Sequence, residues 1–344
     1  MAAMLGYEAL TGVIGMSEAI DLLEATLRHE ADGKTFISPK FNADFGTGSM
    51  RVLVAADHAA GYLATKAYHI IEGVGVRYVV TLYRLKDGEV LAIMDGQLIT
   101  DLRTGAASGV LARRMRLSGP VTIGLIGSGN QARTQLESLA SVYRVRAASV
   151  FSPTPASRER YAQEMSARLG FPITPVDSAQ AAVSGHLVVV TASSARTREP
   201  VLRGQWLDAC RLLCAVGNTR AQFAEADVRS FSDAKLVVTD SSHAFEEAGE
   251  LIAVARENSV PPSRRATLSQ VVSGRAFIPA EGRVAFKSVG TALQDLALAA
   301  RYFERLGAQA KPAHAARSGS LSTVFAWCIR ISLRSGWISR VVVR

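Results

Sequence analysis

The segment Val121–Ala132 constrains the fold of this chain most strongly. Its first part, Val121–Ile126, has the apolar composition of a buried strand, and a Gly-x-Gly-x-x-Ala turn follows it directly. This pattern between a strand and a helix is the fingerprint of a dinucleotide-binding βαβ unit. Gly127 permits the tight turn, and Gly129 lets the backbone approach a pyrophosphate at the helix N-terminus. The segment therefore predicts a nicotinamide-dinucleotide site.

The chain downstream of Gly119-Pro120 predicts a doubly wound parallel sheet. Continuous apolar runs without polar alternation are typical of strands that are buried on both faces. Such runs occur at Val121–Ile126, Ala147–Phe151, Leu187–Val190, Leu212–Ala215 and Leu236–Thr239. Helical patterns separate the first of these strands, as a βαβ topology requires. They cover Gln131–Val142 and Ala156–Leu169.

The chain upstream of that boundary predicts a mixed α/β unit with antiparallel character. Ser17 is expected to cap a helix over Glu18–Glu30. Turn signals then separate short strand-like segments. These are Arg51–Ala55, Tyr62–His69, Tyr78–Arg84 and Val90–Met94. Further helices are expected at Thr100–Met115 and Thr291–Leu306, and the second of them is expected to return from the nucleotide unit to the first unit. The predicted fold class is α/β, with a Rossmann sheet and a second, mixed α/β domain.

The composition argues against several other classes of protein. The formal net charge of the chain is +9. Six basic residues and no acidic residue occur from Lys311 onward, so the rest of the chain carries a net charge of only +3. No nucleic-acid recognition motif accompanies that charge. No apolar stretch of about 18 residues predicts a transmembrane helix. Three cysteines without a CxxC pair argue against a disulfide framework or a zinc site. We therefore expect a cytoplasmic protein without metal, membrane or nucleic-acid binding.

The residues after the second predicted strand favour NADP(H) over NAD(H). An acidic residue near this point holds the ribose 2′-hydroxyl of NAD, and none is present. Ser152, Thr154 and Arg158 instead offer hydroxyl groups and a guanidinium for a 2′-phosphate. NAD(H) stays the alternative. Thr191 and Ser193 follow another strand, and both are expected to contact the cofactor because ligands lie beyond the carboxyl ends of parallel strands.

Several segments together resemble the ornithine cyclodeaminase/mu-crystallin family. They are Ala64–Ala67, Ala92–Gly96, Leu102–Ser108, Ile126–Ala132 and Phe286–Gly290, and the likeness extends over Ala9–Leu306. The resemblance implies a homodimer and hydride exchange at carbon 2 of a small amino or imino acid. It also implies that residues 1–117 and 292–320 form a substrate-binding and dimerisation domain, and that residues 118–291 form the NAD(P)-binding domain. Residues 321–344 are an atypical basic tail.

The resemblance also implies which residues form the site. Lys66 is expected to bind the substrate and to act catalytically as a proton donor, since a lysine in a half-buried strand needs a partner. Arg103 is expected to bind the substrate carboxylate through its planar fork. Lys40 stands where many members have an arginine, and Arg51 is a second candidate for that role, although a surface position is an equal alternative for both. The remaining cofactor contacts are expected from Thr104, Gly127, Ser128, Gly129, Asn130, Gln131 and Asn218. Phe286–Gly290 is interpreted as a structural crossover near the cofactor.

Asn218 decides between the activities that the resemblance allows. Cyclodeaminases of the family carry an aspartate at this position, and asparagine cannot accept a proton at neutral pH. Imine reduction needs only a hydride, one proton donor and a carboxylate site. We therefore favour an NAD(P)H-dependent reductase of small imino acids such as pyrroline- or piperideine-2-carboxylate. The alternatives are ornithine cyclodeaminase, an alanine-dehydrogenase-like enzyme, and a non-catalytic NADPH-binding protein that resembles mu-crystallin.

Overall fold

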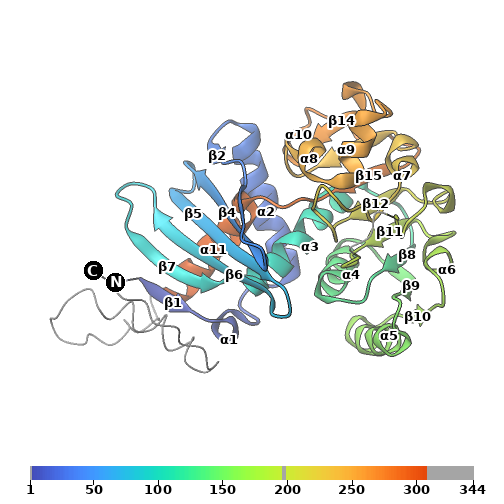
Figure 1. The fold of residues 1–344 in the computed structure, drawn as a ribbon, viewed down its shortest axis with the longest axis horizontal. Helices are drawn as coiled ribbons and strands as arrows, with labels where there is room; N and C mark the ends of the chain where they lie inside the picture. Colours follow the sequence, from blue (N-terminus) through green and yellow to red (C-terminus); the bar gives the residue numbers. More distant parts are fainter. Residues whose placement is uncertain (1, 196–198, 308–344) are drawn as a thin grey trace.

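The chain forms two sheets, which are linked by long helices between them (Figure 1). The computed structural model describes residues 2–195 and 199–307, and the predicted tail at 321–344 lies outside these residues. Among the helices described, none is long and apolar enough to cross a membrane.

The second sheet along the chain has the predicted doubly wound form. Its eight strands are all parallel, in the order β10-β9-β8-β11-β12-β15-β13-β14. The order reverses between β8 and β11, which is where such sheets bind their ligands. The strands are β8 (Val121–Ile126), β9 (Val145–Phe151), β10 (Ile173–Pro175), β11 (Val188–Thr191), β12 (Leu212–Ala215), β13 (Leu236–Thr239), β14 (Arg265–Thr267) and β15 (Val284–Lys287).

Helices cover both faces of this sheet, which confirms the α/β prediction. Leu125 and Val190 show the reason, because both lie in strands whose apolar side chains are buried from either face. The helices are α4 (Asn130–Val142), α5 (Pro155–Leu169), α6 (Ala179–Val183), α7 (Val228–Ser232), α8 (Ala244–Glu247), α9 (Gly249–Arg256) and α10 (Leu268–Val272), with 3-10 turns at Gly204–Trp206 and Pro262–Arg264.

The interpretation of Phe286–Gly290 as a crossover is correct only for its second half. Phe286 and Lys287 belong to β15, which lies in the middle of the sheet between β12 and β13. All four residues of β15 are buried. The crossover itself consists of residues 288–291, which lead directly into α11 (Ala292–Leu306). The sequence did not predict this strand because Lys287 belongs to it, and a charged residue is rare inside a central strand.

The first sheet is mixed, with the order β1-β7-β6-β5-β4-β2 and β3 paired to β4. Only β1 runs parallel to its neighbour, and the other pairs are antiparallel. The elements are β1 (Ala3–Leu5), α1 (Tyr7–Leu10), α2 (Met16–Ala31), β2 (Thr35–Ile37), β3 (Phe41–Asp44), β4 (Gly48–Asp57), β5 (Tyr62–Ile71), β6 (Gly75–Arg84), β7 (Val90–Asp95) and α3 (Gly96–Met115).

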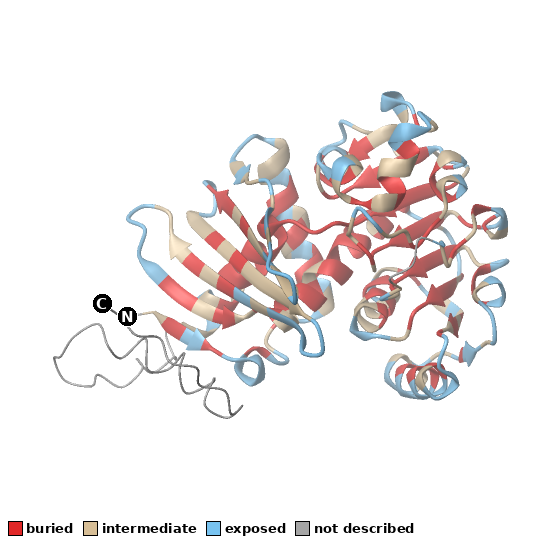
Figure 2. Cartoon of the chain, in the orientation of Figure 1, coloured by how far each residue is buried: buried red, intermediate tan, exposed pale blue. Residues whose placement is uncertain are grey.

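One face of this first sheet packs against helices, and on the other face no described helix packs. Burial alternates along the strands: Ala64, Lys66, Val80 and Leu82 are buried, whereas Val79 is exposed (Figure 2). The buried face packs against α11, which has returned to this sheet as predicted, and against α3. The other face carries the half-buried and exposed side chains.

Two predicted helix starts were wrong, and each has a local reason. The first helix begins at Met16 with Gly15 as its N-cap, so Ser17 lies inside its first turn. The helix expected from Thr100 begins at Gly96, because the side chain of Asp95 accepts a hydrogen bond from Gln97 N at 2.8 Å and caps it there. Within α3, Thr100 contacts Lys66 of β5, and Arg103, about one turn later, contacts α11.

Candidate active site

A cavity of about 140 Å³ lies where the two sheets meet. Residues from β5, β6, α3, the segment after β12 and the crossover line it. Five of the predicted site residues are among them: Lys40, Lys66, Arg103, Thr104 and Gln131. The structure therefore brings together predicted residues that are far apart in sequence, whereas Arg51 does not line this cavity.

Lys66 is the central cation of the cavity. Its side chain is only 2% exposed, and its ammonium donates hydrogen bonds to Asp295 Oδ1 and Thr100 Oγ1, both at 2.7 Å. Thr100 Oγ1 donates its own proton to Gly96 O at 2.6 Å, so it accepts from Lys66. These bonds use two of the three N–H groups, and the third is left for a ligand in the cavity. The Tyr78 ring lies 4.9 Å away and adds a cation–π contact.

Burial changes the proton affinity of Lys66. Desolvation lowers its pKa from 10.5 to about 8, with Arg103 acting in the same direction and Asp295 opposing both. A lysine with a pKa near 8 is protonated at neutral pH and still gives up its proton readily. Lys66 thus has the properties of a proton donor.

Arg103 lies on the opposite side of Asp295. Its Nε is 3.3 Å from Asp295 Oδ1, and its Nη1 donates to Gln294 Oε1 at 3.1 Å. The guanidinium lies against Gly290, where a Cβ would come within 2.5 Å of Nη1. Lys66 and Arg103 share one carboxylate, so the group carries one net positive charge. A substrate carboxylate is the complementary ligand.

Asp295 also has an unused acceptor. Its Oδ2 is buried and has no hydrogen-bond partner among the described residues, although Asp295 lines the cavity. An orphaned carboxylate oxygen is costly unless a ligand donates to it. An N–H group of a bound substrate is a suitable donor.

Asp240 holds the crossover and, through Gln294, Arg103. Its carboxylate accepts from Val289 N, Gly290 N and Ser288 Oγ at 2.8, 3.0 and 2.6 Å. It also accepts from Gln294 Nε2 at 3.0 Å. A carboxylate can only accept and a guanidinium can only donate, so the amide of Gln294 has one orientation between them.

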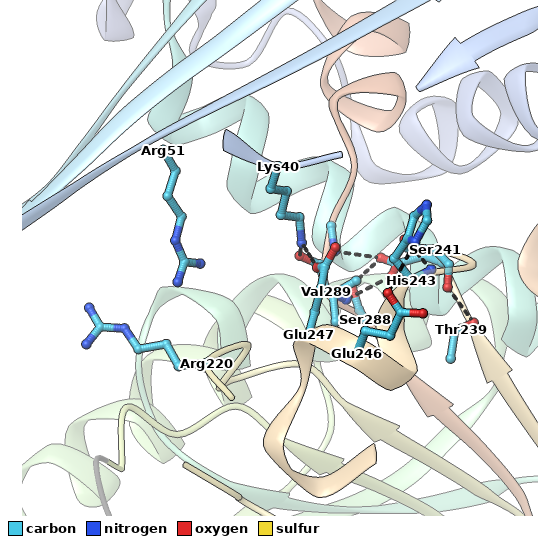
Figure 3. A network of polar contacts seen from close by, with 12 residues as sticks. Lys40, Arg51, Arg220, Thr239, Ser241, His243, Glu246, Glu247, Ser288 and Val289 are labelled. Atoms are coloured by element: carbon cyan, nitrogen blue, oxygen red, sulfur yellow. Dashed lines mark hydrogen bonds and ion pairs between the residues drawn. The ribbon is translucent and has the colours of Figure 1, made fainter. Parts of the chain in front are cut away.

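Lys40 lies at the edge of the cavity in a network with the nucleotide-binding half (Figure 3). Its ammonium pairs with the Glu247 carboxylate of α8 and donates to Val289 O at 2.9 Å. Lys40 therefore lines the cavity, but its charge is already compensated by Glu247. Arg51 lies on β4, and its Nη1 donates to the hydroxyl of Tyr68 at 3.3 Å.

The glycine-rich turn fits a dinucleotide. Gly127 has a φ of 112°, which favours glycine, and a Cβ there would collide with Ala192 O. A Cβ at Gly129 would meet nothing within 4 Å, so the space beside that backbone is open. Gly129 is also the N-cap of α4 and provides no side-chain cap. Gln131, at the first turn, has a buried Oε1 without a hydrogen-bond partner in the described part of the chain.

The segment after β9 presents the three residues predicted for a 2′-phosphate. Ser152 Oγ accepts from Ser128 Oγ at 3.0 Å, which ties this segment to the glycine-rich turn. Thr154 is the N-cap of α5, with no side-chain cap hydrogen bond. Arg158 is buried, donates to Ser152 O at 3.1 Å and pairs with Asp177, so it is no solvated helix residue.

Thr191, Ser193 and Asn218 are joined by a buried glutamate that sequence reasoning missed. Glu225 accepts from Ser193 Oγ at 2.7 Å and from Asn218 N at 2.8 Å, and Thr191 Oγ1 lies 3.5 Å away. Asn218 uses its side chain to shape the loop, since Nδ2 donates to Ala195 O and Oδ1 accepts from Arg220 N. Glu225 therefore holds the loops beyond two strand ends that are expected to face the cofactor.

Asp295 is the main residue of the cavity that the sequence did not reveal. It lies three residues after Ala292 and four before Ala299 on α11, hence on the buried face of that helix. An acidic residue at such a position was the available signal. A second buried pair, Lys287 Nζ with Glu250 Oε1 at 2.8 Å, lies under the Asn218 loop, and Lys287 also donates to Asn218 O.

Comparisons with known proteins agree with this geometry. Residues 2–310 match the model of the ornithine cyclodeaminase/mu-crystallin family. The chain belongs to that family. The alanine dehydrogenase of Archaeoglobus fulgidus is 29% identical over 314 residues, which cover 88% of this chain and 94% of the relative. The ketimine reductase mu-crystallin of Rattus norvegicus is 28% identical over 258 residues, which cover 73% and 79%.

The fold is also that of a solved relative. The structure of Thermococcus litoralis Delta(1)-pyrroline-2-carboxylate reductase in complex with NADH and L-proline matches with a TM-score of 0.83 and 28% identity. The match covers 89% of this chain and 98% of that one.

Proposed function

We propose that the protein is an NAD(P)H-dependent reductase of small 2-imino acids, including cyclic ketimines such as pyrroline- and piperideine-2-carboxylate. The observation that carries the proposal is the group formed by Lys66, Arg103 and Asp295 in a cavity beside the glycine-rich turn. It offers one net positive charge, one proton donor and one unused acceptor. Relatives named as a ketimine reductase and a pyrroline-2-carboxylate reductase support it.

The substrate carboxylate binds between Arg103 and Lys66. Arg103 contributes the N–H groups that Gln294 and Asp295 leave unused, and Lys66 contributes its third N–H. Binding fixes carbon 2 and its nitrogen beside Asp295, whose Oδ2 accepts from the N–H of an iminium or amine.

Proton transfer is assigned to Lys66. A nicotinamide cofactor, when bound, would supply the hydride that carbon 2 of the C=N bond accepts. Lys66, or a water molecule that it holds, gives the proton that nitrogen needs, and Asp295 stabilises the charge on Lys66 before transfer. The product is an amino acid with a new C–H bond and a new N–H bond.

The cofactor is assigned to the edge of the sheet between β8 and β11. Gly127, Ser128, Gly129 and Asn130 would hold its pyrophosphate at the N-terminus of α4. Ser152, Thr154 and Arg158 favour NADP(H), because no carboxylate at the end of β9 is present for a ribose 2′-hydroxyl. Thr104, Gln131, Thr191, Ser193 and Asn218 complete the contacts.

Ornithine cyclodeamination is the weaker assignment. It needs a carboxylate that can take up a proton, and Asn218 cannot do so. Alanine-dehydrogenase-like reduction of an open imino acid uses the same residues and is included in the proposal.

A homodimer through the outer face of the first sheet is part of the proposal. Large apolar side chains are exposed there and in the neighbouring β2–β3 segment, among them Phe41, Met50 and Val79. Patches of this kind on a single protein are typical of interaction surfaces.

Substrate turnover tests the function. Purified protein is supplied with NADPH or NADH and, separately, with pyrroline-2-carboxylate, piperideine-2-carboxylate, and pyruvate plus ammonium. We expect cofactor oxidation with at least one of these imino acids, and faster oxidation of NADPH than of NADH. Proline formed from ornithine without added reductant would instead establish a cyclodeaminase, and tight NADPH binding without any turnover would favour a binding protein.

A further inference from the structure

The cavity has an acceptor without a partner on the side of the nucleotide-binding half. Gln131 lines the cavity from the first turn of α4. Its Nε2 donates to Asp101 Oδ1 at 2.7 Å, whereas its Oε1 is buried and receives no hydrogen bond from any residue within 2–195 and 199–307. A buried amide oxygen without a donor is costly, so this atom is available for a ligand.

Asp101 fixes which end of that amide is left for a ligand. It lies on α3, is only 7% exposed, and uses both carboxylate oxygens as acceptors. Oδ1 accepts from Gln131 Nε2, and Oδ2 accepts from Gln97 Nε2 at 3.0 Å. A carboxylate can only accept, so the nitrogen of Gln131 faces Asp101 and the oxygen faces away from it.

The cations of the cavity favour the ionised form of Asp101. Burial raises the pKa of this carboxyl, and the hydrogen bond from Gln97 and the charges of Arg103 and Lys66 oppose that rise. Asp101 acts on Lys66 in return, because its charge favours the protonated ammonium. Asp101 is therefore coupled to the site, although it does not line the cavity.

Gln131 connects the two parts of the candidate site. It directly follows Asn130 of the glycine-rich turn, and it lines the same cavity as Lys66, Arg103 and Asp295. A ligand group at this place belongs either to the substrate or to the nicotinamide end of the cofactor. Both carry an N–H group, since the substrate has its imino or amino nitrogen and the nicotinamide has its carboxamide.

We propose that Asp101 is a positioning residue, which holds the Gln131 amide so that Oε1 accepts a hydrogen bond from an N–H group of the ligand. Asp101 acts through Gln131 and does not touch the ligand itself. The two sources of the N–H group rest on the proposed reductase function. The orientation of the amide rests only on the hydrogen bonds that Asp101 accepts.

Substitutions at Gln97, which does not line the cavity, can set the orientation of the Gln131 amide. Asp101→Asn gives position 101 one donor and one acceptor, and the side chain at position 97 decides which of them faces Gln131. With Gln97→Glu, the new amide donates to position 97 and still accepts from Gln131. With Gln97→Lys, it accepts from position 97 and donates to Gln131, whose amide then turns over.

Ligand affinity is the readout and requires no turnover. Below about pH 7, where Lys66 stays protonated, NADPH is titrated into the unliganded protein by fluorescence, and proline into the protein loaded with NADP⁺ by calorimetry. Asp101→Asn with Gln97→Lys should bind one of these ligands about 10-fold or more weakly than Asp101→Asn with Gln97→Glu, because a donor then faces a donor. A loss for NADPH assigns the N–H group to the carboxamide, and a loss for proline assigns it to the substrate.

Gln97→Lys alone is the matched control. It introduces the same charge, but the lysine donates to the Asp101 carboxylate and the Gln131 amide keeps its orientation. Both affinities should stay within about threefold of those of the parent protein. Gln131→Met removes the acceptor itself and should weaken the same ligand by the same factor, which keeps the test decisive if a double variant does not fold. Equal affinities in the two double variants, or parent-like affinities in Gln131→Met, contradict the proposal.

A turnover assay separates this inference from the proposed function. Reduction of pyrroline-2-carboxylate, with equal affinities in the two double variants, overturns the role of Asp101 and leaves the reductase intact. The expected difference in affinity, with no reduction of any imino acid, supports the role of Asp101 and overturns the reductase.

Discussion

At the residue scale, the site depends on how one carboxylate is shared. Asp295 stabilises the ammonium of Lys66, which burial alone would deprotonate further, and it fixes Arg103 beside it. Without Asp295, two buried cations would face each other across the cavity. The acid is therefore as necessary to the site as the two cations that are proposed to bind substrate.

The pH profile of reduction should report Lys66. Its pKa is lowered to about 8, so the ammonium form dominates below that pH and is lost above it. We expect kcat/KM for imine reduction to be flat up to pH 8 and then to fall about tenfold per pH unit. Burial is the main cause of this low pKa, and the charged groups that modify it are Asp295, Arg103 and Asp101.

Lys66→Arg controls for titration of the substrate. Arginine keeps its charge over this pH range. The variant should have low activity, and its kcat/KM should not fall above pH 8. The same decline in both proteins would assign it to the imine and not to Lys66.

Ser152→Asp should change the cofactor preference. A carboxylate at the end of β9 repels a 2′-phosphate and accepts from a ribose 2′-hydroxyl. We expect kcat/KM to fall at least ~10-fold with NADPH and to rise with NADH, as one charge-assisted contact implies. Ser157→Asp, on the same helix turn as Arg158, is the control for added charge alone. Equal losses with both cofactors would argue against a 2′-phosphate at Ser152.

The residues that the sequence predicted best are those that lie in motifs with a fixed context. Lys66 and Arg103, which were predicted from such segments, both line the cavity, and their roles in binding and catalysis stay predictions. Asp295 and Glu225 were not found, because a buried acid shows its partner only after distant strands and helices have come together. The separation between Lys66 and Asp295 is 229 residues.

At the element scale, the crossover between β15 and α11 connects the nucleotide-binding half to the cavity. Asp240 binds three consecutive crossover residues and Gln294, so the end of β13 determines where Arg103 lies. Gly290 is part of the same arrangement, with a φ of 75° and its Cα against the guanidinium.

Gly290→Ala tests whether the contact between Gly290 and the Arg103 guanidinium matters for substrate binding, apart from the backbone strain that any side chain causes at a positive φ. The added Cβ would come within 2.5 Å of Arg103 Nη1 and would displace the guanidinium. Gly274→Ala is the matched control, because its φ is 76° and a Cβ there meets nothing within 4 Å. Both should lose about 1 kcal/mol of unfolding free energy, measured by urea denaturation. Only Gly290→Ala should raise the substrate KM, by about 10-fold. An equal KM in the two variants would contradict the role of the crossover.

The elements were predictable where periodicity was unbroken. The parallel strands and α11 follow the apolar patterns, whereas β15 was missed because Lys287 interrupts its pattern and is neutralised only by Glu250 from α9. The short strands β2 and β3 escaped prediction for another reason. Each pairs with β4 alone, and much of their surface is exposed, so they show little burial pattern.

At the scale of the whole molecule, the exposed apolar surface is unevenly distributed. Ten of the eleven large apolar side chains that are exposed among the described residues lie between Met4 and Val90, and the other is Phe277. The nucleotide-binding half has no comparable patch in the part of the chain described. This asymmetry is why we assign dimerisation to the first sheet.

Val79→Asp should dissociate the proposed dimer. Val79 is 45% exposed on the face of β6 opposite to the cavity, so the substitution places a charge in the expected interface and leaves the site intact. Sedimentation velocity should show a dimer for the parent protein and a monomer for the variant. Phe277→Asp, at a residue that is 86% exposed, should stay dimeric. A monomeric parent, or a dimeric Val79→Asp, would contradict this interface.

The most direct test of the whole account is the position that the hydride reaches. The enzyme is given pyrroline-2-carboxylate and NADPH that carries deuterium at carbon 4 of the nicotinamide, and the proline formed is analysed by mass spectrometry and NMR. The account predicts one deuterium at carbon 2 from one face of the cofactor, with no transfer in Lys66→Met above a few per cent of the parent rate, as loss of a general acid implies. Proline without deuterium at carbon 2, or no proline at all, would contradict it.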